Sequence, residues 1–333
     1  MKNKYQNGFL IFGLVVLVLM VLQLDFKEVW EGVRHAGYWF FGVVILWAFL
    51  YIFNTFTWWI IIRSGREKGS DEHINFLWLY KITVSGFALN YATPGGLMGG
   101  EPYRIMSLSP KIGTERASSS VILFAMTHIF SHFWFWLVSI ILFIIFKPID
   151  VGMGILLSCA GAFCLLGLWF FIVGYRKGLA LRAMRLLGKI PFVKKWAVPF
   201  IENHREQLDK IDSQIASLHS QSPRTFVTAV LSELSCRICS AMEIWFCLRV
   251  LNPEVNYIDC ILILAFTSLF ANLLFFIPLQ LGGREGGFLM SARGLKMTAS
   301  EGVFVALLVR LREIIWTAIG LLLIKIEKKR EQD

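Results

Sequence analysis

Eight apolar segments alternate with short polar stretches along the chain. They are residues 8–22, 38–62, 76–92, 117–146, 151–173, 226–248, 257–277 and 302–324. Most of them have the length that a helix needs to cross the roughly 30 Å hydrocarbon core of a bilayer. They lack the alternation over roughly ten residues that is typical of a membrane barrel strand. The pattern therefore predicts an all-α polytopic membrane protein with a single transmembrane domain, residues 1–333.

Two glycine-rich breaks interrupt the pattern, at residues 91–104 and 276–287. A shift of 184 positions superimposes them without a gap and matches Pro94 with Pro278, Leu97 with Leu281, Gly99 with Gly283, Glu101 with Glu285 and Thr114 with Thr298. Proline and glycine both disfavour a continuous helix. In lipid, such a break is tolerated only where protein or a water-filled cavity satisfies its backbone groups. We expect a broken helix or a re-entrant hairpin at each break, within repeats over about residues 38–146 and 224–325.

Basic residues are concentrated between the repeats and at the end of the chain. In the connector, about residues 175–222, lysines and arginines alternate with apolar residues, which predicts amphipathic helices that lie on anionic lipid. A cytoplasmic loop that obeys the positive-inside rule is the simpler interpretation. Placing the N-terminus, the connector and the basic tail in the cytoplasm requires an even number of crossings between them. Either form of break satisfies this requirement and gives the two repeats opposite orientations, as in many transporters.

The end of the first break has the features of an anion-binding helix start. Gly99 and Gly100 precede Glu101 and a proline, and Arg104 lies one turn further along. Glycine backbone N–H groups at a helix N-terminus attract anions, and the planar guanidinium of arginine can bond two phosphate oxygens at once. The second break offers the same groups in Gly283, Arg284 and Glu285. The alternative is that glutamate and arginine pair with each other to neutralise a buried break, and the two interpretations are compatible.

Further ionisable residues lie inside the apolar segments. Glu233 and Arg237 are spaced for a same-helix pair, whereas Arg312 and Glu243 need partners elsewhere. His128 falls opposite Arg312 under the 184-residue shift, which favours a polar lining over a catalytic centre. His128 and His132 have the spacing of metal ligands, but the zinc-protease pattern is absent. We expect no metal, no cofactor and no catalytic residues, because the sequence also lacks a nucleophile elbow and a phosphate-binding loop.

Composition supports the membrane assignment. Hydrophobic residues make up 56% of the chain and charged residues 17%, with a mean hydropathy of +0.62. The net charge of +10 sits in a few loops, so it indicates topology and contact with anionic lipid rather than nucleic-acid binding. The six scattered cysteines do not suggest a disulfide framework.

The first break, with the sequence Thr93-Pro-Gly-Gly-Leu-Met-Gly-Gly-Glu-Pro-Tyr-Arg104, carries a family resemblance. Together with Pro278 and Gly282-Gly283-Arg284-Glu285-Gly286, it resembles the signature stretches of the lysylphosphatidylglycerol synthase transmembrane-region family, also called flippase-like membrane proteins. The resemblance implies a bacterial inner-membrane protein that moves lipids between leaflets. Some members carry a domain that transfers lysine from tRNA to phosphatidylglycerol. This chain shows no such domain, so the resemblance implies the flippase-like part alone.

The leading expectation is a flippase or scramblase-like transporter for a phospholipid or a lipid-linked anionic headgroup. Arg104 and Arg284 would bind phosphate, while Glu101 and Glu285 would balance charge or accept an amine. One alternative is an intramembrane enzyme or accessory subunit of lipid or lipid-linked sugar modification, with a break glutamate as acid or base. Another is a small-ion transporter that uses His128 and Glu233. The expected partners are membrane lipids, and a homo-oligomer is compatible with the sequence.

Overall fold

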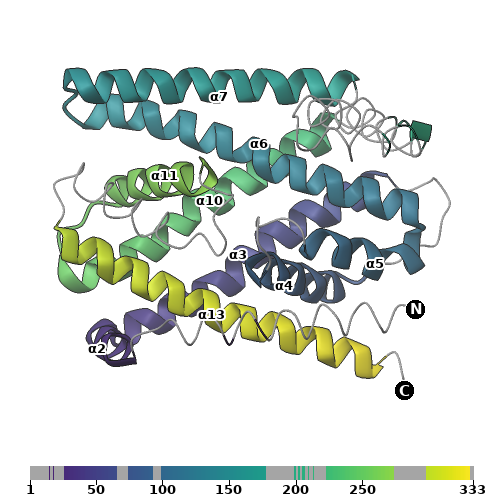
Figure 1. The fold of residues 1–333 in the computed structure, drawn as a ribbon, viewed down its shortest axis with the longest axis horizontal. Helices are drawn as coiled ribbons and strands as arrows, with labels where there is room; N and C mark the ends of the chain where they lie inside the picture. Colours follow the sequence, from purple (N-terminus) through teal and green to yellow (C-terminus); the bar gives the residue numbers. More distant parts are fainter. Residues whose placement is uncertain are drawn as a thin grey trace.

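The computed structural model describes residues 26–65, 74–92, 99–177, 223–273 and 298–330, together with isolated residues between 15 and 213. The helices are α2 (Phe26–Ala36), α3 (Tyr38–Ser64), α4 (Phe76–Ala92), α5 (Gly100–Ile112), α6 (Thr114–Phe146), α7 (Val151–Lys177), α10 (Pro223–Leu251), α11 (Tyr257–Leu273) and α13 (Ala299–Arg330) (Figure 1). Within these ranges no residue is in a strand, which confirms the all-α prediction. The segment at residues 8–22, most of the connector and the second break lie outside the described residues.

Three of the described helices are long and apolar enough to cross a membrane: α3, α6 and α7 over residues 151–173. Helices α10 and α13 are as long, with 29 and 32 residues, but they carry more charged side chains. Helix α5 has only 13 residues, and at about 1.5 Å per residue it is too short to span the bilayer core. The protein is therefore an α-helical membrane protein, and the crossing of all eight apolar segments stays a prediction.

Helices α4 and α5 form a hairpin that opens toward one end of the bundle. Next to the turn, the backbone N–H of Gly100 donates a hydrogen bond to Asn90 Oδ1 at 2.7 Å. At the open end, Lys111 Nζ lies 4.5 Å from the ring centroid of Trp78. Because α5 runs back along α4, the hairpin enters and leaves the bundle on the same side.

The open end of this hairpin coincides with a cluster of helix ends that we call the basic end. There, Arg116 at the start of α6 donates to the carbonyl of Ile62 near the end of α3, at 3.2 Å. Exposed basic residues at this end include Arg63, Lys111 and Arg224. The ends of α7 and α13 point the same way in Figure 1. The ends of α7 and α13 therefore lie on one side of the molecule, together with the end of α3 and the starts of α6 and α10.

The opposite end holds α2, the α6–α7 turn, the end of α10 and the starts of α11 and α13 (Figure 1). Lys147 Nζ after α6 pairs with Asp259 Oδ1 of α11 at 2.6 Å. The rings of His35 in α2 and Phe304 in α13 meet edge to face at 5.8 Å. Helices α11 and α13 therefore both begin on the side opposite the basic end.

Helices on the two sides of the connector follow the same order and spacing. Shifted by 184 residues, α3 falls at 222–248, α4 at 260–276 and α6 at 298–330, close to the bounds of α10, α11 and α13. Helices α3 and α10 are antiparallel. Trp39 near the start of α3 lies 5.5 Å from Phe246 near the end of α10, measured between ring centroids, whereas Asn54 Nδ2 further along α3 lies 3.2 Å from Cys236 Sγ, which precedes Phe246 in α10. These two helices form the centre of the bundle.

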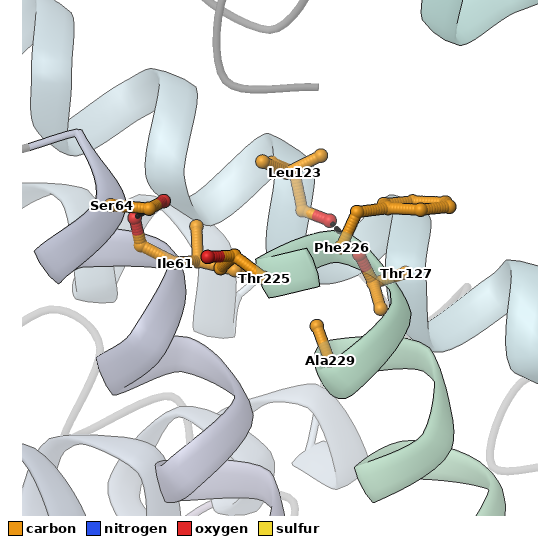
Figure 2. A pocket seen from close by; sticks show the side chains of 7 residues that line it. All are labelled: Ile61, Ser64, Leu123, Thr127, Thr225, Phe226 and Ala229. Atoms are coloured by element: carbon orange, nitrogen blue, oxygen red, sulfur yellow. Dashed lines mark hydrogen bonds between the residues drawn. The ribbon is translucent and has the colours of Figure 1, made fainter. Parts of the chain in front are cut away.

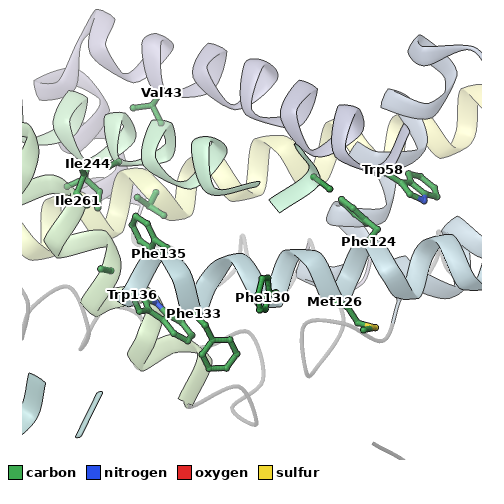
Figure 3. Close-up of a cluster of buried hydrophobic side chains, with 14 of the residues drawn as sticks. Val43, Trp58, Phe124, Met126, Phe130, Phe133, Phe135, Trp136, Ile244 and Ile261 are labelled. Atoms are coloured by element: carbon green, nitrogen blue, oxygen red, sulfur yellow. The ribbon is translucent and has the colours of Figure 1, made fainter. Parts of the chain in front are cut away.

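The core is aromatic, and α6 supplies many of its rings. Phe124, Phe130, Phe133, Phe135 and Trp136 of this helix are buried (Figure 3). Helix α7 packs along α6 and leaves Val151, Ile155, Leu165, Leu166 and Trp169 exposed. Apolar side chains on the outside of a membrane protein face lipid, so this row is the natural lipid-facing surface of α7.

Candidate substrate site

Arg104, in the first turns of α5, is enclosed by aromatic rings. Its side chain is only 1% exposed. The guanidinium carbon lies 4.6 Å from the ring centroid of Phe87 in α4, 5.2 Å from Phe124 in α6 and 5.9 Å from Trp58 in α3. A guanidinium is attracted to the negative faces of such rings, most strongly away from water. The cage therefore stabilises a positive charge inside the bundle.

Short polar contacts hold the start of α5 and this arginine together. Arg104 Nη1 donates to Glu101 Oε1 at 3.2 Å, and Asn90 Nδ2 donates to the same oxygen at 3.0 Å. Asn90 also accepts the backbone N–H of Gly100, and so satisfies one of the free donors at a helix start. The predicted Glu101–Arg104 pair is therefore present. Glu101 Oε2 and Arg104 Nε have no hydrogen-bond partner among the described residues.

Two glycines allow this close approach of α4 and α5. A Cβ atom on Gly100 would lie 2.1 Å from the carbonyl oxygen of Gly86, and one on Gly86 would lie 2.4 Å from Arg104 Nε. Real Cβ contacts are essentially never so short, so a side chain on Gly100 would require a helix to move, and one on Gly86 would require the Arg104 side chain to shift. Gly99, the residue before α5, is also buried. The glycines of the first break thus determine where the arginine lies.

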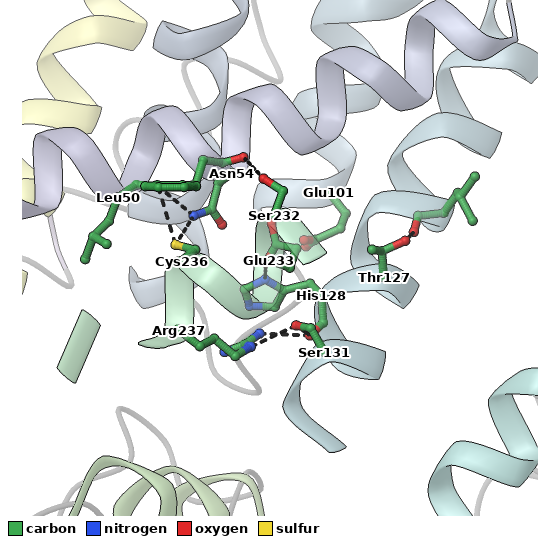
Figure 4. A network of polar contacts seen from close by, with 12 residues as sticks. Leu50, Asn54, Glu101, Thr127, His128, Ser131, Ser232, Glu233, Cys236 and Arg237 are labelled. Atoms are coloured by element: carbon green, nitrogen blue, oxygen red, sulfur yellow. Dashed lines mark hydrogen bonds and ion pairs between the residues drawn. The ribbon is translucent and has the colours of Figure 1, made fainter. Parts of the chain in front are cut away.

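A second polar cluster joins α6 to α10 (Figure 4). His128 Nδ1 lies 2.7 Å from Glu233 Oε2, and the two side chains are 28% and 1% exposed. Arg237 donates to Ser131 Oγ and to the carbonyl oxygen of His128, both at 2.8 Å. The predicted same-helix pair is therefore replaced: Glu233 and Arg237 each contact α6 instead of one another. The sequence pattern does not predict these contacts, because Glu233 lies more than a hundred residues from His128 in the chain.

The two clusters share two aromatic rings. Phe87 and Phe124, which contact the Arg104 guanidinium, also lie 6.0 and 6.4 Å from the imidazole of His128. The two clusters therefore lie on either side of shared rings and form a row of buried and partly buried polar groups on α4, α5, α6 and α10. We call this row the polar track, and its members are Asn90, Glu101, Arg104, His128, Ser131, Glu233 and Arg237.

Arg312 lies in a separate cluster. Its Nε and Nη2 donate to the two oxygens of Glu243 at 2.7 and 2.9 Å, and its guanidinium carbon lies 3.8 Å from the ring centroid of Trp47. The Arg312 side chain is fully buried. Tyr51, whose ring contacts both Trp47 and Phe87, stands between this cluster and the polar track. The structure therefore does not bring Arg312 and His128 into one lining, although both face an acid of α10.

A small pocket lies near the basic end, with about 290 Å³ of space that includes open solvent and room for about one water molecule (Figure 2). Its lining consists of Ile61, Ser64, Leu123, Thr127, Thr225, Phe226 and Ala229. None of the predicted site residues lines it. Ala229 is one turn before Glu233 on α10, however, and Thr127 precedes His128 on α6. The pocket thus lies one helical turn from the polar track.

Two sets of predicted residues remain to be placed. Gly283, Arg284 and Glu285 lie outside the described residues, so the predicted equivalence of the two breaks stays a prediction. His128 and His132 meet edge to face, with ring centroids 5.4 Å apart. Across the described ranges, no three histidine, cysteine or acidic side chains are grouped so as to hold a metal ion.

Comparison with known proteins identifies the family. No curated protein and no solved structure matches the sequence. The family model described as "Lysylphosphatidylglycerol synthase TM region" matches residues 8–320, which include both breaks and every described helix in whole or in part. This match confirms the resemblance carried by the glycine-rich breaks, and the chain belongs to the lysylphosphatidylglycerol synthase transmembrane-region family.

Proposed function

We propose that this protein is a flippase or scramblase-like transporter that passes the anionic headgroup of a phospholipid or lipid-linked substrate along the polar track. The observation that carries the proposal is the burial of Arg104 within the membrane bundle. A charged side chain at the centre of a membrane helix costs about 2.5 to 3.5 kcal/mol on insertion scales, and such residues mark substrate and ion pathways. Arg104 stands beside three further charged members of the track.

The surroundings of Arg104 suit a phosphate group. Only one carboxylate oxygen, that of Glu101, contacts the guanidinium in the described conformation. A phosphate that displaced this carboxylate would gain two parallel N–H···O bonds from the guanidinium and the favourable dipole of the α5 N-terminus. Glu101 and Asn90 would then be free to bond hydroxyl or amine groups of the headgroup. The Glu101–Arg104 pair is therefore the resting state of the site, and substrate binding opens it.

An inverted repeat would give the substrate access from both sides, and two features support it. The hairpin of α4 and α5 enters from the basic end, whereas α11 and α13 both start at the opposite end. The contact between α6 and α11, in which Trp136 Nε1 donates to Ser268 Oγ at 2.9 Å, maps under the 184-residue shift onto positions 320 and 84. Gly320 of α13 indeed packs on Val84 of α4. Repeats in opposite orientations typify transporters with alternating access.

The basic end is the cytoplasmic side in this proposal. Lysines and arginines that flank membrane helices are enriched in the cytoplasm. More of the described ones lie at this end, among them Arg63, Lys111, Arg116 and Arg224, than at the opposite end, which has Lys27, Arg34, Lys147 and Arg249. Both chain termini would then be cytoplasmic, in a bacterial inner membrane. Protease accessibility of tags at either terminus in spheroplasts tests this orientation, and cleavage of either tag from outside would contradict it.

Reconstitution in liposomes tests transport directly. The purified protein is incorporated with trace fluorescent phospholipids, and a membrane-impermeant quencher reports how much lipid reaches the outer leaflet. We expect faster exchange than in empty vesicles, a large loss with Arg104→Gln, and normal exchange with the control Arg34→Gln, which changes an exposed arginine of α2. If neither phosphatidylglycerol nor other anionic lipids move, the proposal is wrong.

Lipid analysis of a deletion strain separates transport from the enzymatic alternative. A transporter leaves the inventory of lipid species unchanged and alters their distribution between leaflets. The loss of a lipid species, restored by the intact gene, would instead favour an enzyme or accessory subunit of lipid modification.

A further inference from the structure

We propose that His128, paired with Glu233, is a proton-binding site that couples the uptake of one proton to the binding of one anionic headgroup in the polar track. This inference rests on the proposed transport function and adds its energy source. It would make the proton gradient across the membrane a driving force for lipid movement.

The charge of the polar track is balanced before any substrate enters. Glu101 and Glu233 are negative, Arg104 and Arg237 are positive, and these four charges sum to zero. They include the charged groups that face His128: Glu233 and Arg237 from α10, and Arg104 from α5 across the shared rings. An anionic phosphate would therefore bring an uncompensated charge into a region of low dielectric, where such a charge is costly.

A histidine is the side chain that can remove this imbalance near neutral pH, because its ordinary titration range spans about pH 5 to 8. Nδ1 of His128 is held by Glu233, so Nδ1–H donates to the carboxylate and Nε2 is left to take up a proton. The track then carries one positive charge, which the phosphate neutralises. Proton and anion each strengthen the binding of the other, and linkage requires this effect to be reciprocal.

The second histidine of the helix is less suited to this role. His132 stacks on Trp136 at 5.2 Å and meets His128 edge to face. No carboxylate contacts it among the described residues, and its Nδ1 lacks a hydrogen-bond partner there. A positive imidazole at this position would be buried without a counter-charge, whereas His128 has Glu233.

Access also favours His128. More than a quarter of its side-chain surface is exposed, while its partner Glu233 is buried. The pocket one turn away opens near the basic end and is lined by three hydroxyl groups, those of Ser64, Thr127 and Thr225. Protons are therefore expected to reach the exposed edge of the imidazole from this side of the bundle.

Calorimetry measures the proton count. The purified protein in detergent is titrated with short-chain phosphatidylglycerol at about pH 7.5 in two buffers of different ionisation enthalpy, and the difference in heat gives the protons taken up. We expect about one proton per lipid bound in the wild type, and about none for His128→Gln. The matched control His35→Gln, on α2, keeps the wild-type value. Binding without proton uptake, or unchanged uptake in His128→Gln, would overturn the proposal.

A second variant covers the case in which His128→Gln does not fold. Glu233→Gln keeps the shape of the side chain but removes the charge that stabilises the imidazolium. The substitution also leaves the track with the single positive charge that the proton would otherwise supply, so we expect Glu233→Gln to bind lipid without proton uptake and with little dependence on pH. An unchanged pH dependence in this variant would contradict the assigned pair.

Vesicles with an imposed pH gradient separate the two proposals. A trapped pH indicator and the leaflet assay are read together. Lipid exchange that the gradient accelerates, accompanied by proton entry, supports coupling. If lipid exchange is independent of the pH gradient and no protons enter, the proposed coupling is wrong, while the proposed lipid transport is still supported. The absence of any exchange and of any lipid binding refutes transport itself.

Discussion

The buried pair of Arg312 and Glu243 gives the most quantitative prediction. Two hydrogen bonds of 2.7 and 2.9 Å join the side chains, which are 0% and 5% exposed. Arg312→Met leaves the Glu243 charge buried and unpaired, and Glu243→Leu leaves Arg312 with only its longer contact of 3.8 Å to Glu313 Oε1, each at a cost of about 3 to 5 kcal/mol. We therefore expect Glu243→Leu and Arg312→Met each to lower the free energy of unfolding by about that amount.

The double variant should be much more stable than the sum of the two single changes. It removes both charges of the pair, and its remaining losses are the contact of the guanidinium with Trp47, worth about 2 kcal/mol when desolvated, and the 3.8 Å contact of Arg312 with Glu313. The two substitutions should thus show a coupling energy of at least about 3 kcal/mol in a double-mutant cycle.

Reversible unfolding in mixed micelles, followed by circular dichroism as denaturing detergent is added, measures these energies. The pair Lys147–Asp259 is the matched control, because its 2.6 Å contact is similarly short but its side chains are 25% and 22% exposed. Because its partly exposed side chains stay in contact with water, we expect this pair to contribute only about 0 to 1 kcal/mol. If breaking the Arg312–Glu243 pair costs no more than breaking the control pair, or if the double variant loses the full sum, the reasoning from burial is wrong.

Three further substitutions test the packing and the site. Gly86→Ala places a Cβ atom 2.4 Å from Arg104 Nε, so it should cost about 1 to 3 kcal/mol in the same unfolding assay, and a neutral result would contradict the tight approach of α4 and α5. Arg104→Lys keeps the charge but loses two-oxygen binding, so lipid exchange in vesicles should fall about tenfold or more; full activity would argue against a phosphate role. Trp136→Phe removes the hydrogen bond to Ser268 and should cost about 0.5 to 1.5 kcal/mol, whereas an unchanged unfolding energy would show that this contact does not hold α6 to α11.

Helix positions follow closely from the sequence because membrane helices require long apolar runs. The segment predicted at 76–92 has the bounds of α4, and the segment at 38–62 ends two residues before α3 does. Helix α2 was missed, since its charged residues hide a short amphipathic pattern with Phe26, Val29, Trp30 and Val33 on one face. The spacing of these apolar residues, three or four apart, was the available signal.

The site was predictable only where its partners are close in the chain. The pairing of Glu101 with Arg104 could be predicted, because the two residues lie three positions, or about one helical turn, apart. The choice between a broken helix and a hairpin was open, because it depends on how closely Gly86 and Gly100 approach, which no local pattern encodes. The partner of His128 was equally hidden. A buried histidine that carries a charge needs an acidic partner, but the sequence does not show which acid on another helix contacts His128.

Helix α10 carries both acids that neutralise buried cations of other helices. Glu233 and Glu243 lie ten residues, or about 15 Å, apart on one rigid rod. Glu243 pairs with Arg312, which keeps its charge, whereas Glu233 pairs with His128, whose charge changes with pH in the proposal above. If His128 gains or loses its proton as proposed, the ion pair at one acid of α10 changes while the ion pair at the other stays, so one helix at the centre of the bundle carries both a constant and a variable contact.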